Sequence, residues 1–255
     1  MILGGMTLSM DLLTHADHAV KPKAEPVAPV DETVVVQRCA QYRDGLKGTA
    51  VSFPATLLRF TAAREWIRRQ RAGVHVTTDG ELAQAVVAGT EPSRIVIHPR
   101  EGAGEPRPRT MSAEAARVVV SSREQVARVA AYAQRRRQVL VDAMADDVGA
   151  LVSDVVARGE LDLVGLHCRL DAGDVVGALT LSRAVAEMSW IRREHDVLAT
   201  QISLANLDVG RRCERWILRR VAGAIFEVID DACARHRFPR PALTVAPSRA
   251  ALLGH

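Results

Sequence analysis

Aromatic residues are scarce in this sequence, at 4% of 255 residues, so a core must be built mainly from aliphatic side chains. Hydrophobic residues still make up 48% of the chain and charged residues 25%, which are ordinary values for a globular protein. A core of valine, leucine, isoleucine and alanine suits parallel strands that are covered by helices. The composition therefore favours an α/β protein.

Lysine is also rare, occurring only as Lys21, Lys23 and Lys47, and the net charge of +4 comes from dispersed arginines. The arginine clusters show no zinc-finger spacing and no aromatic interleaving, fall mostly in helical patterns and are typical of solvated helix faces. We therefore expect no binding to nucleic acid.

The sequence has no C-x-x-C pair, and its four cysteines are typical of reduced thiols. No uncharged stretch approaches the length of a membrane span. The first twenty residues carry Asp11 and Asp17 and lack a basic segment, so we expect no signal peptide and no membrane association. These features predict a cytoplasmic protein.

The first thirty residues contain Pro22, Pro26 and Pro29, which exclude a regular helix there. We interpret 1–30 as a flexible N-terminal leader and 31–255 as one domain. Asp31 is a good N-cap for a helix through residue 42.

From residue 49 onward, short apolar runs alternate with helical patterns. The predicted strands are 49–53, 74–77, 94–98, 116–120, 139–142, 161–167, 202–204 and 243–245. The predicted helices are 57–71, 79–87, 123–134, 146–156, 175–196 and 211–236. This alternation predicts a TIM-like (β/α)8 barrel, either complete or a fragment of one, with a doubly wound open sheet as the alternative. No dinucleotide-binding glycine motif or P-loop follows a predicted strand.

Three segments at predicted strand ends carry a family resemblance. They are Gly80-Glu81-Leu82, Gly165-Leu166-His167-Cys168-Arg169 and Val245-Ala246-Pro247-Ser248-Arg249. In this order they resemble the "S-G-G-E-L", "G-L-H-x-H" and "E-P-G-R" motifs of the diaminopimelate decarboxylases. That family, with the ornithine and arginine decarboxylases, has an alanine-racemase-type barrel that uses pyridoxal phosphate. The resemblance implies this barrel and a link to amino-acid metabolism.

The resemblance also exposes a missing group. In the family, a lysine at the end of the first barrel strand forms a Schiff base with the cofactor, and Pro54 stands at the matching position here. An anchor must reach the C-terminal ends of the strands. Lys21 and Lys23 lie in the leader and Lys47 precedes the strand, so we expect none of the three to replace it.

Other departures fall on the cofactor site that the resemblance implies. The second histidine of "H-x-H" is Arg169 here, and the glutamate that pairs with the pyridine nitrogen is Ala246. The segment 204–210 lacks the consecutive glycines of a phosphate loop. The family's C-terminal β-domain, which completes the substrate site across a dimer interface, is also expected to be absent.

His167 and Arg249 are the predicted remnants of the cofactor site, with His98 and Glu81 also retained. One interpretation is that Arg249 grips an anionic ligand beside His167. The other, which we favour, is structural: Glu81 caps a helix, His167 is a satisfied strand-end residue, and Arg249 is ion-paired or exposed. No catalytic residue and no metal ligand set is predicted.

We therefore predict a non-catalytic pseudoenzyme that binds a ligand or a protein, without cofactor or with pyridoxal phosphate held non-covalently. The alternative is an enzyme with an altered site, either a residual decarboxylase or a lyase that does not use pyridoxal phosphate. Predicted partners are a second copy of the chain or an active decarboxylase paralogue.

Overall fold

The computed structural model describes residues 30–99, 116–171, 174, 176–210 and 213–253. Residues 1–29, which include Lys21 and Lys23, lie outside this part, so the leader and the domain division stay predictions. Within it, no helix is long and apolar enough to cross a membrane.

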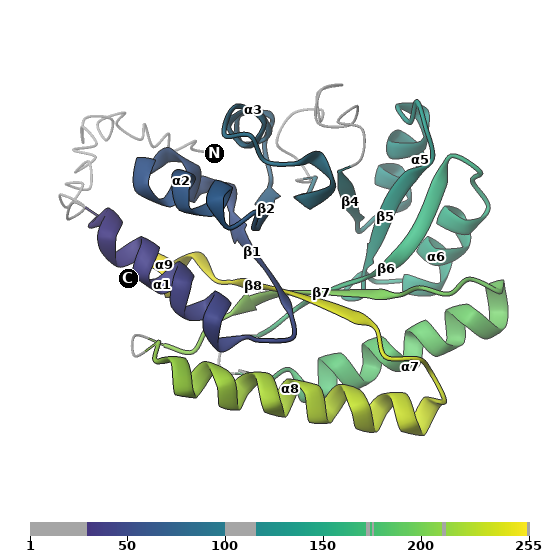
Figure 1. Ribbon diagram of the computed structural model, residues 1–255. Helices are drawn as coiled ribbons and strands as arrows, with labels where there is room; N and C mark the ends of the chain where they lie inside the picture. Colours follow the sequence, from purple (N-terminus) through teal and green to yellow (C-terminus); the bar gives the residue numbers. More distant parts are fainter. Residues whose placement is uncertain (1–29, 100–115, 172–173, 175, 211–212, 254–255) are drawn as a thin grey trace, which may run out of the picture.

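Eight parallel strands close into a barrel in chain order, with β1 paired to both β2 and β8 (Figure 1). The strands are β1 (Ala50–Pro54), β2 (Gly73–Val76), β3 (Ile95–Ile97), β4 (Arg117–Val120), β5 (Arg137–Asp142), β6 (Leu161–Arg169), β7 (Gln201–Leu207) and β8 (Ala242–Pro247). The predicted barrel is confirmed. Closure excludes the open sheet and shows that the barrel is complete, not a fragment.

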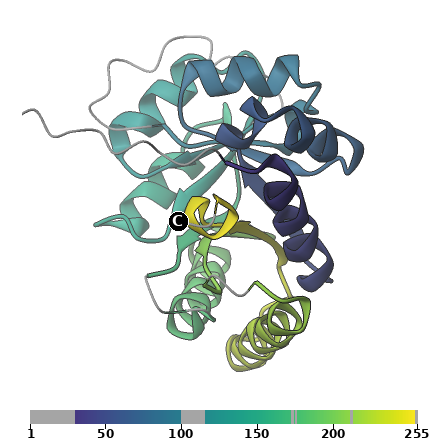
Figure 2. The same cartoon turned by 90° about the vertical axis from the view of Figure 1, so that its left-hand side faces the viewer.

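Helices surround the strands in both views (Figures 1 and 2). They are α1 (Glu32–Gly45), α2 (Thr61–Arg69), α3 (Asp79–Val87), α5 (Arg123–Ala131), α6 (Val148–Val156), α7 (Ala178–His195), α8 (Arg215–His236) and α9 (Arg249–Leu253), with 3-10 turns η1 (Ala55–Arg59) and η2 (Pro92–Arg94). Helices α7 and α8 lie side by side, and α1 packs against α8 and α9.

Local signals account for most helix starts. The Asp31 carboxylate accepts a hydrogen bond from Thr33 N at 2.8 Å, and the Ser122 hydroxyl accepts one from Gln125 N at 3.3 Å, as the two predicted caps require. The predicted helix over 57–71 is wrong in one respect. Phe60 has an extended backbone (ψ 123°), so the segment is divided into η1 and α2.

The strands alternate between two environments. Side chains that point outward pack under the helices in one large apolar cluster. Inward-pointing Val96, Val119 and Leu140 form a second, small cluster with Val164. Four strands also place a polar side chain inward, namely Ser52 on β1, His75 on β2, His167 on β6 and Ser203 on β7. This departure from an apolar barrel interior defines the candidate site.

Candidate ligand site at the C-terminal mouth

A cavity of about 410 Å³ opens at the C-terminal ends of β3 to β6. Its polar lining residues are His98, Ser121, Gln125, Asp142, Asp146, His167 and Arg169. Barrels of this kind bind their ligands at this end of the strands.

A chain of polar side chains runs from the barrel interior to this cavity. The Ser52 hydroxyl is hydrogen-bonded to His75 Nε2, and His75 Nδ1 lies 2.6 Å from His98 Nε2. The His98 and His167 rings then meet edge to face, with centroids 4.7 Å apart. His167 Nδ1 is 3.2 Å from the Ser203 hydroxyl. Each imidazole therefore has a polar partner or a neighbouring ring inside the barrel.

These three histidines are held in the neutral form. Burial lowers the pKa of His75 and His167 well below the usual range, and repulsion from the neighbouring histidines lowers both further. Burial, with the nearby Arg169 guanidinium, lowers the pKa of His98 to about 4. A neutral imidazole both donates and accepts a hydrogen bond, so the hydrogen-bonded part of the chain, Ser52–His75–His98, can carry a proton in either direction.

Charge at the cavity comes from an arginine and two carboxylates. Asp142 is 8% exposed, and its Oδ1 accepts a hydrogen bond from Met144 N at 3.0 Å. Its Oδ2 lies 3.8 Å from Arg169 Nη2, which is a loose ion pair. Asp146 lines the same cavity. A positive and a negative group are thus presented side by side. The described residues contain no group of three or more His, Cys, Asp or Glu side chains placed to hold a metal ion.

The residues predicted from sequence have different locations. His167 and His98 line the cavity. Glu81 caps the N-terminus of α3, because its carboxylate accepts hydrogen bonds from Thr77 N at 2.6 Å and from the Thr77 hydroxyl at 2.9 Å. Arg249 is exposed at the start of α9 and is not among the residues that line this cavity. Whether Arg249 and His167 serve one ligand stays a prediction.

Sequence reasoning missed His75, Ser52, Ser203 and Asp142. The signal was present in the strands, because Ser52 lies between Val51 and Phe53 and His75 lies between Val74 and Val76. In a strand whose apolar neighbours point outward, the residue between them points inward.

The residues at the predicted phosphate position do not suit a phosphate. After β7, Asp208 Oδ1 accepts a hydrogen bond from Gly210 N at 2.8 Å, and its Oδ2 accepts one from the Ser248 hydroxyl at 2.9 Å. A phosphate could accept hydrogen bonds from these two donors, but the Asp208 carboxylate already does so. Its negative charge would also repel a phosphate.

The anchor and ring positions do not suit pyridoxal phosphate either. Pro54 ends β1 at the mouth, whereas Lys47, the lysine present among the described residues, lies before β1 at the opposite end of the barrel. Ala246 is buried in β8, and its methyl group cannot pair with a pyridine nitrogen. Among the described residues, the positions that the resemblance assigns to the anchor, the ring partner and the phosphate do not fit the cofactor.

Comparisons with known proteins agree with the resemblance seen in the motifs. No protein-family model matches the chain. A diaminopimelate decarboxylase of Actinosynnema pretiosum subsp. auranticum is 24% identical over 258 residues, covering 88% of this chain and 58% of that protein. The chain therefore spans less than two thirds of that relative's length.

Solved structures show the same fold. The diaminopimelate decarboxylase of M. jannaschii superposes with a TM-score of 0.72 at 13% identity, over 88% of this chain and 60% of that one. The ornithine decarboxylase of Entamoeba histolytica gives 0.68 at 14% identity, over 86% and 63%. The lysine decarboxylase of Selenomonas ruminantium gives 0.65 at 16% identity, over 86% and 60%. The decarboxylase-like barrel predicted from the motifs is confirmed.

Proposed function

We propose that this chain is a non-catalytic relative of the amino-acid decarboxylases that use pyridoxal phosphate, and that it binds a small ligand at its C-terminal mouth. The observation that carries the proposal is the Asp208 carboxylate, which takes hydrogen-bond donors that a phosphate would need. Pro54 at the anchor position and Ala246 at the ring position support it. Each change removes a separate requirement of the chemistry, so no single substitution would restore it.

The mouth suits a small zwitterion such as a free amino acid. Arg169 presents a guanidinium that matches a carboxylate, and Asp142 with Asp146 presents negative charge for an ammonium group. The loose 3.8 Å ion pair leaves both partners able to turn to a ligand. The neutral His98 and His167 add hydrogen-bonding groups without charge.

The cofactor test is a titration with pyridoxal phosphate, read by visible absorbance before and after borohydride reduction and by peptide mass. An active diaminopimelate decarboxylase serves as the positive control. We expect no reducible imine and no release of carbon dioxide from amino acids. An imine mapped to Lys21, Lys23 or Lys47 would overturn the loss of the anchor and restore decarboxylation as the leading function.

The ligand test is calorimetry with free amino acids on the purified chain. Asp142→Asn is expected to weaken binding about tenfold or more, since it removes a charged partner. Asp231→Asn, an exposed acid on α8, is the matched control and should bind as the unchanged protein does. Equal affinity in both variants would show that the mouth is not the site.

A second candidate is a lyase that acts without pyridoxal phosphate. The histidine chain favours it, because Ser52, His75 and His98 could move a proton between the barrel interior and a bound substrate. If amino acids that bind are also converted, His98→Gln should abolish turnover while His236→Gln leaves it unchanged. Binding without conversion would leave the first proposal in place.

The predicted association with a second copy or an active paralogue is also a proposal, as is the cytoplasmic location. Light scattering of the purified chain, alone and mixed with an active decarboxylase, tests the first. A monomeric mass for the chain alone, together with a mixture that contains only the two separate proteins and no complex, would contradict it.

A further inference from the structure

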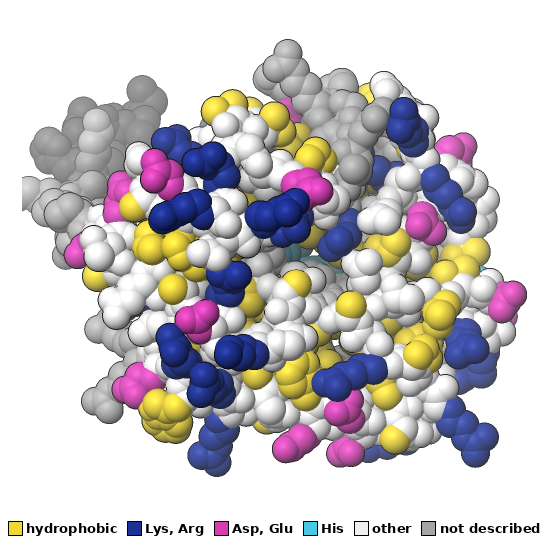
Figure 3. Space-filling view, viewed as in Figure 1, with side chains coloured by type: hydrophobic (Ala, Val, Ile, Leu, Met, Phe, Trp, Pro, Cys, Tyr) yellow, Lys and Arg dark blue, Asp and Glu magenta, His cyan; other side chains and the backbone are white. Residues whose placement is uncertain are grey.

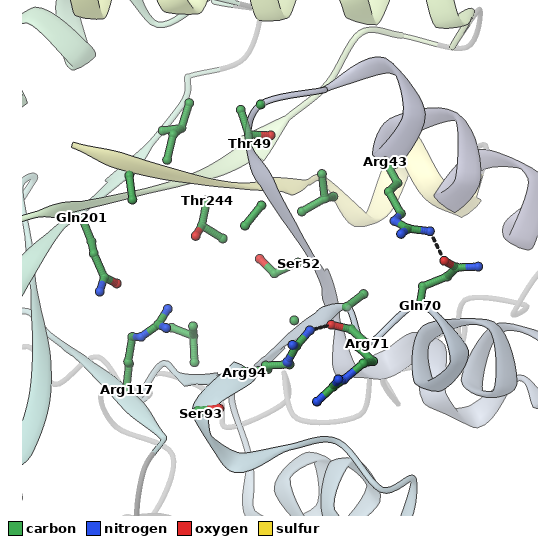
Figure 4. A pocket seen from close by; sticks show the side chains of 18 residues that line it. Arg43, Thr49, Ser52, Gln70, Arg71, Ser93, Arg94, Arg117, Gln201 and Thr244 are labelled. Carbon is green, nitrogen blue, oxygen red and sulfur yellow. Dashed lines mark hydrogen bonds between the residues drawn. The ribbon is translucent and has the colours of Figure 1, made fainter. Parts of the chain in front are cut away.

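A second cavity, of about 660 Å³, lies at the N-terminal end of the barrel, opposite the mouth. It is lined by the residues at the beginnings of β1, β2, β4, β7 and β8 (Figure 4). The inward side chains there include Ala50, Ser52, Ala242 and Thr244, which are too small to fill the space between the strands. The barrel is therefore hollow at this end.

Four arginines line this cavity, namely Arg43, Arg71, Arg94 and Arg117, and no aspartate or glutamate is among its lining residues. In the space-filling view, arginine and lysine side chains surround the central hollow of this face (Figure 3). Such a concentration of one sign of charge attracts anions and raises their local concentration.

The nearby neutralising groups are fewer than the arginines. Glu91 pairs with both Arg71, at 3.4 Å, and Arg94, at 3.0 Å. The guanidinium of Arg43 donates to the neutral Gln70 side chain. One carboxylate thus serves two of the four cations.

Arg117 is the least satisfied of the four. Its Nε is buried without a hydrogen-bond partner, and no ion pair with a described residue reaches it. Burial lowers its pKa, and no acidic side chain among the described residues opposes that effect. In the close view, the side chains of Arg117, Gln201, Thr244 and Ser52 face the same space (Figure 4). Arg117 as a whole is half-buried, and a guanidinium that is partly withdrawn from water beside a cavity is stabilised when an anion enters.

We propose that this N-terminal cavity binds a small molecule that carries a phosphate group, with Arg117 as its central contact. The guanidinium fork matches a phosphate, and several arginines together suit its second negative charge better than a single carboxylate does. The Thr244 hydroxyl and the Gln201 amide, which also line the cavity, provide further hydrogen bonds, whereas the Ser52 hydroxyl is already bonded to His75 Nε2. This site is separate from the mouth and does not depend on the function proposed there.

The experiment is calorimetry of the full chain with inorganic phosphate and pyrophosphate, at constant ionic strength and with succinate as the carboxylate probe. We expect the phosphates to bind more tightly than succinate. Arg117→Gln should weaken phosphate binding tenfold or more. Arg220→Gln, an exposed arginine of α8, should leave it unchanged.

Several results would overturn the proposal: no binding at millimolar phosphate, equal binding by Arg117→Gln and the unchanged chain, or tighter binding of succinate. If Arg117→Gln does not fold, Arg43→Gln at the exposed rim decides the question. Weakened phosphate affinity in that folded variant supports the site, and unchanged affinity overturns it.

Discussion

Acidification is expected to destabilise this barrel, because three histidines of its interior are neutral when folded and become charged when unfolded. An unfolded histidine has a pKa near 6.5. In the folded chain the pKa of His98 is lowered to about 4, and those of His75 and His167 are well below 6.5. The unfolded state therefore binds more protons below pH 6.5, and stability rises with pH. The contribution is fully present above that pH and is lost as the pH falls.

The magnitude follows from the shift in pKa. When the pH falls from about 7.5 to about 5, each histidine that stays neutral in the folded state lowers the free energy of unfolding by about 2 kcal/mol. His75 and His98 are partly exposed to solvent, so we discount the sum for three groups to about 4 kcal/mol. A domain of this kind is stable by about 5–15 kcal/mol, so the loss is a large share of the total.

Urea unfolding at a series of pH values measures this effect, with tryptophan fluorescence as the signal. Trp66 is a suitable reporter, because it packs edge to face on Phe53 in the core, with ring centroids 5.6 Å apart. His98→Asn should reduce the proton uptake on unfolding by about one proton. A free energy of unfolding that stays constant between about pH 7.5 and about pH 5 would refute the argument.

Three further predictions concern stability and reactivity. Gly165→Ala should cost about 3 kcal/mol or more in urea unfolding, because a Cβ there would lie 1.9 Å from the Gln201 carbonyl oxygen on the neighbouring strand. Gly223→Ala, with nothing within 4 Å, should instead stabilise helix α8; equal effects of the two would contradict the close contact between β6 and β7. Ser122→Ala should cost about 1 kcal/mol through loss of the α5 cap, and an unchanged midpoint would show that the cap is dispensable. Burial raises the pKa of the four cysteine thiols, Cys39, Cys168, Cys213 and Cys233. Thiol titration of the folded chain at mild alkaline pH should therefore detect little reaction before urea is added. Rapid labelling of the native chain would contradict the burial of these thiols.

Local patterns predicted all eight strands and most of the helices, but not the short helix α9. All eight strands were found, because each is a short aliphatic run between turn signals, and the side chains on its outward face are apolar. The helix starting at Asp79 and the caps at Asp31 and Ser122 followed from residues within four positions of each other. The break at Phe60 was missed, since an extended residue inside a helical pattern carries no local signal.

The site could be predicted only in part. Motif order and strand ends led to His167 and His98, and the structure places both at the mouth. The partners of these histidines were not predicted. His75 and Ser52 are 23 residues apart in the chain, as are His75 and His98, and strand pairing alone brings them into contact.

The sequence by itself determined that this chain forms alternating strands and helices, because periodicity is a local property. Through the resemblance to the decarboxylases, it also placed Pro54 where that family has its lysine. Only the tertiary structure decided which polar groups face one another. Closing the sheet turned alternate residues of eight strands into one shared interior, where Ser52, His75 and His98 join and Arg117 is left beside a hollow without an acidic partner among the described residues. Those contacts depend on strand register and barrel closure. Both are set by the pairing of all eight strands together, so no single segment of the sequence predicts them.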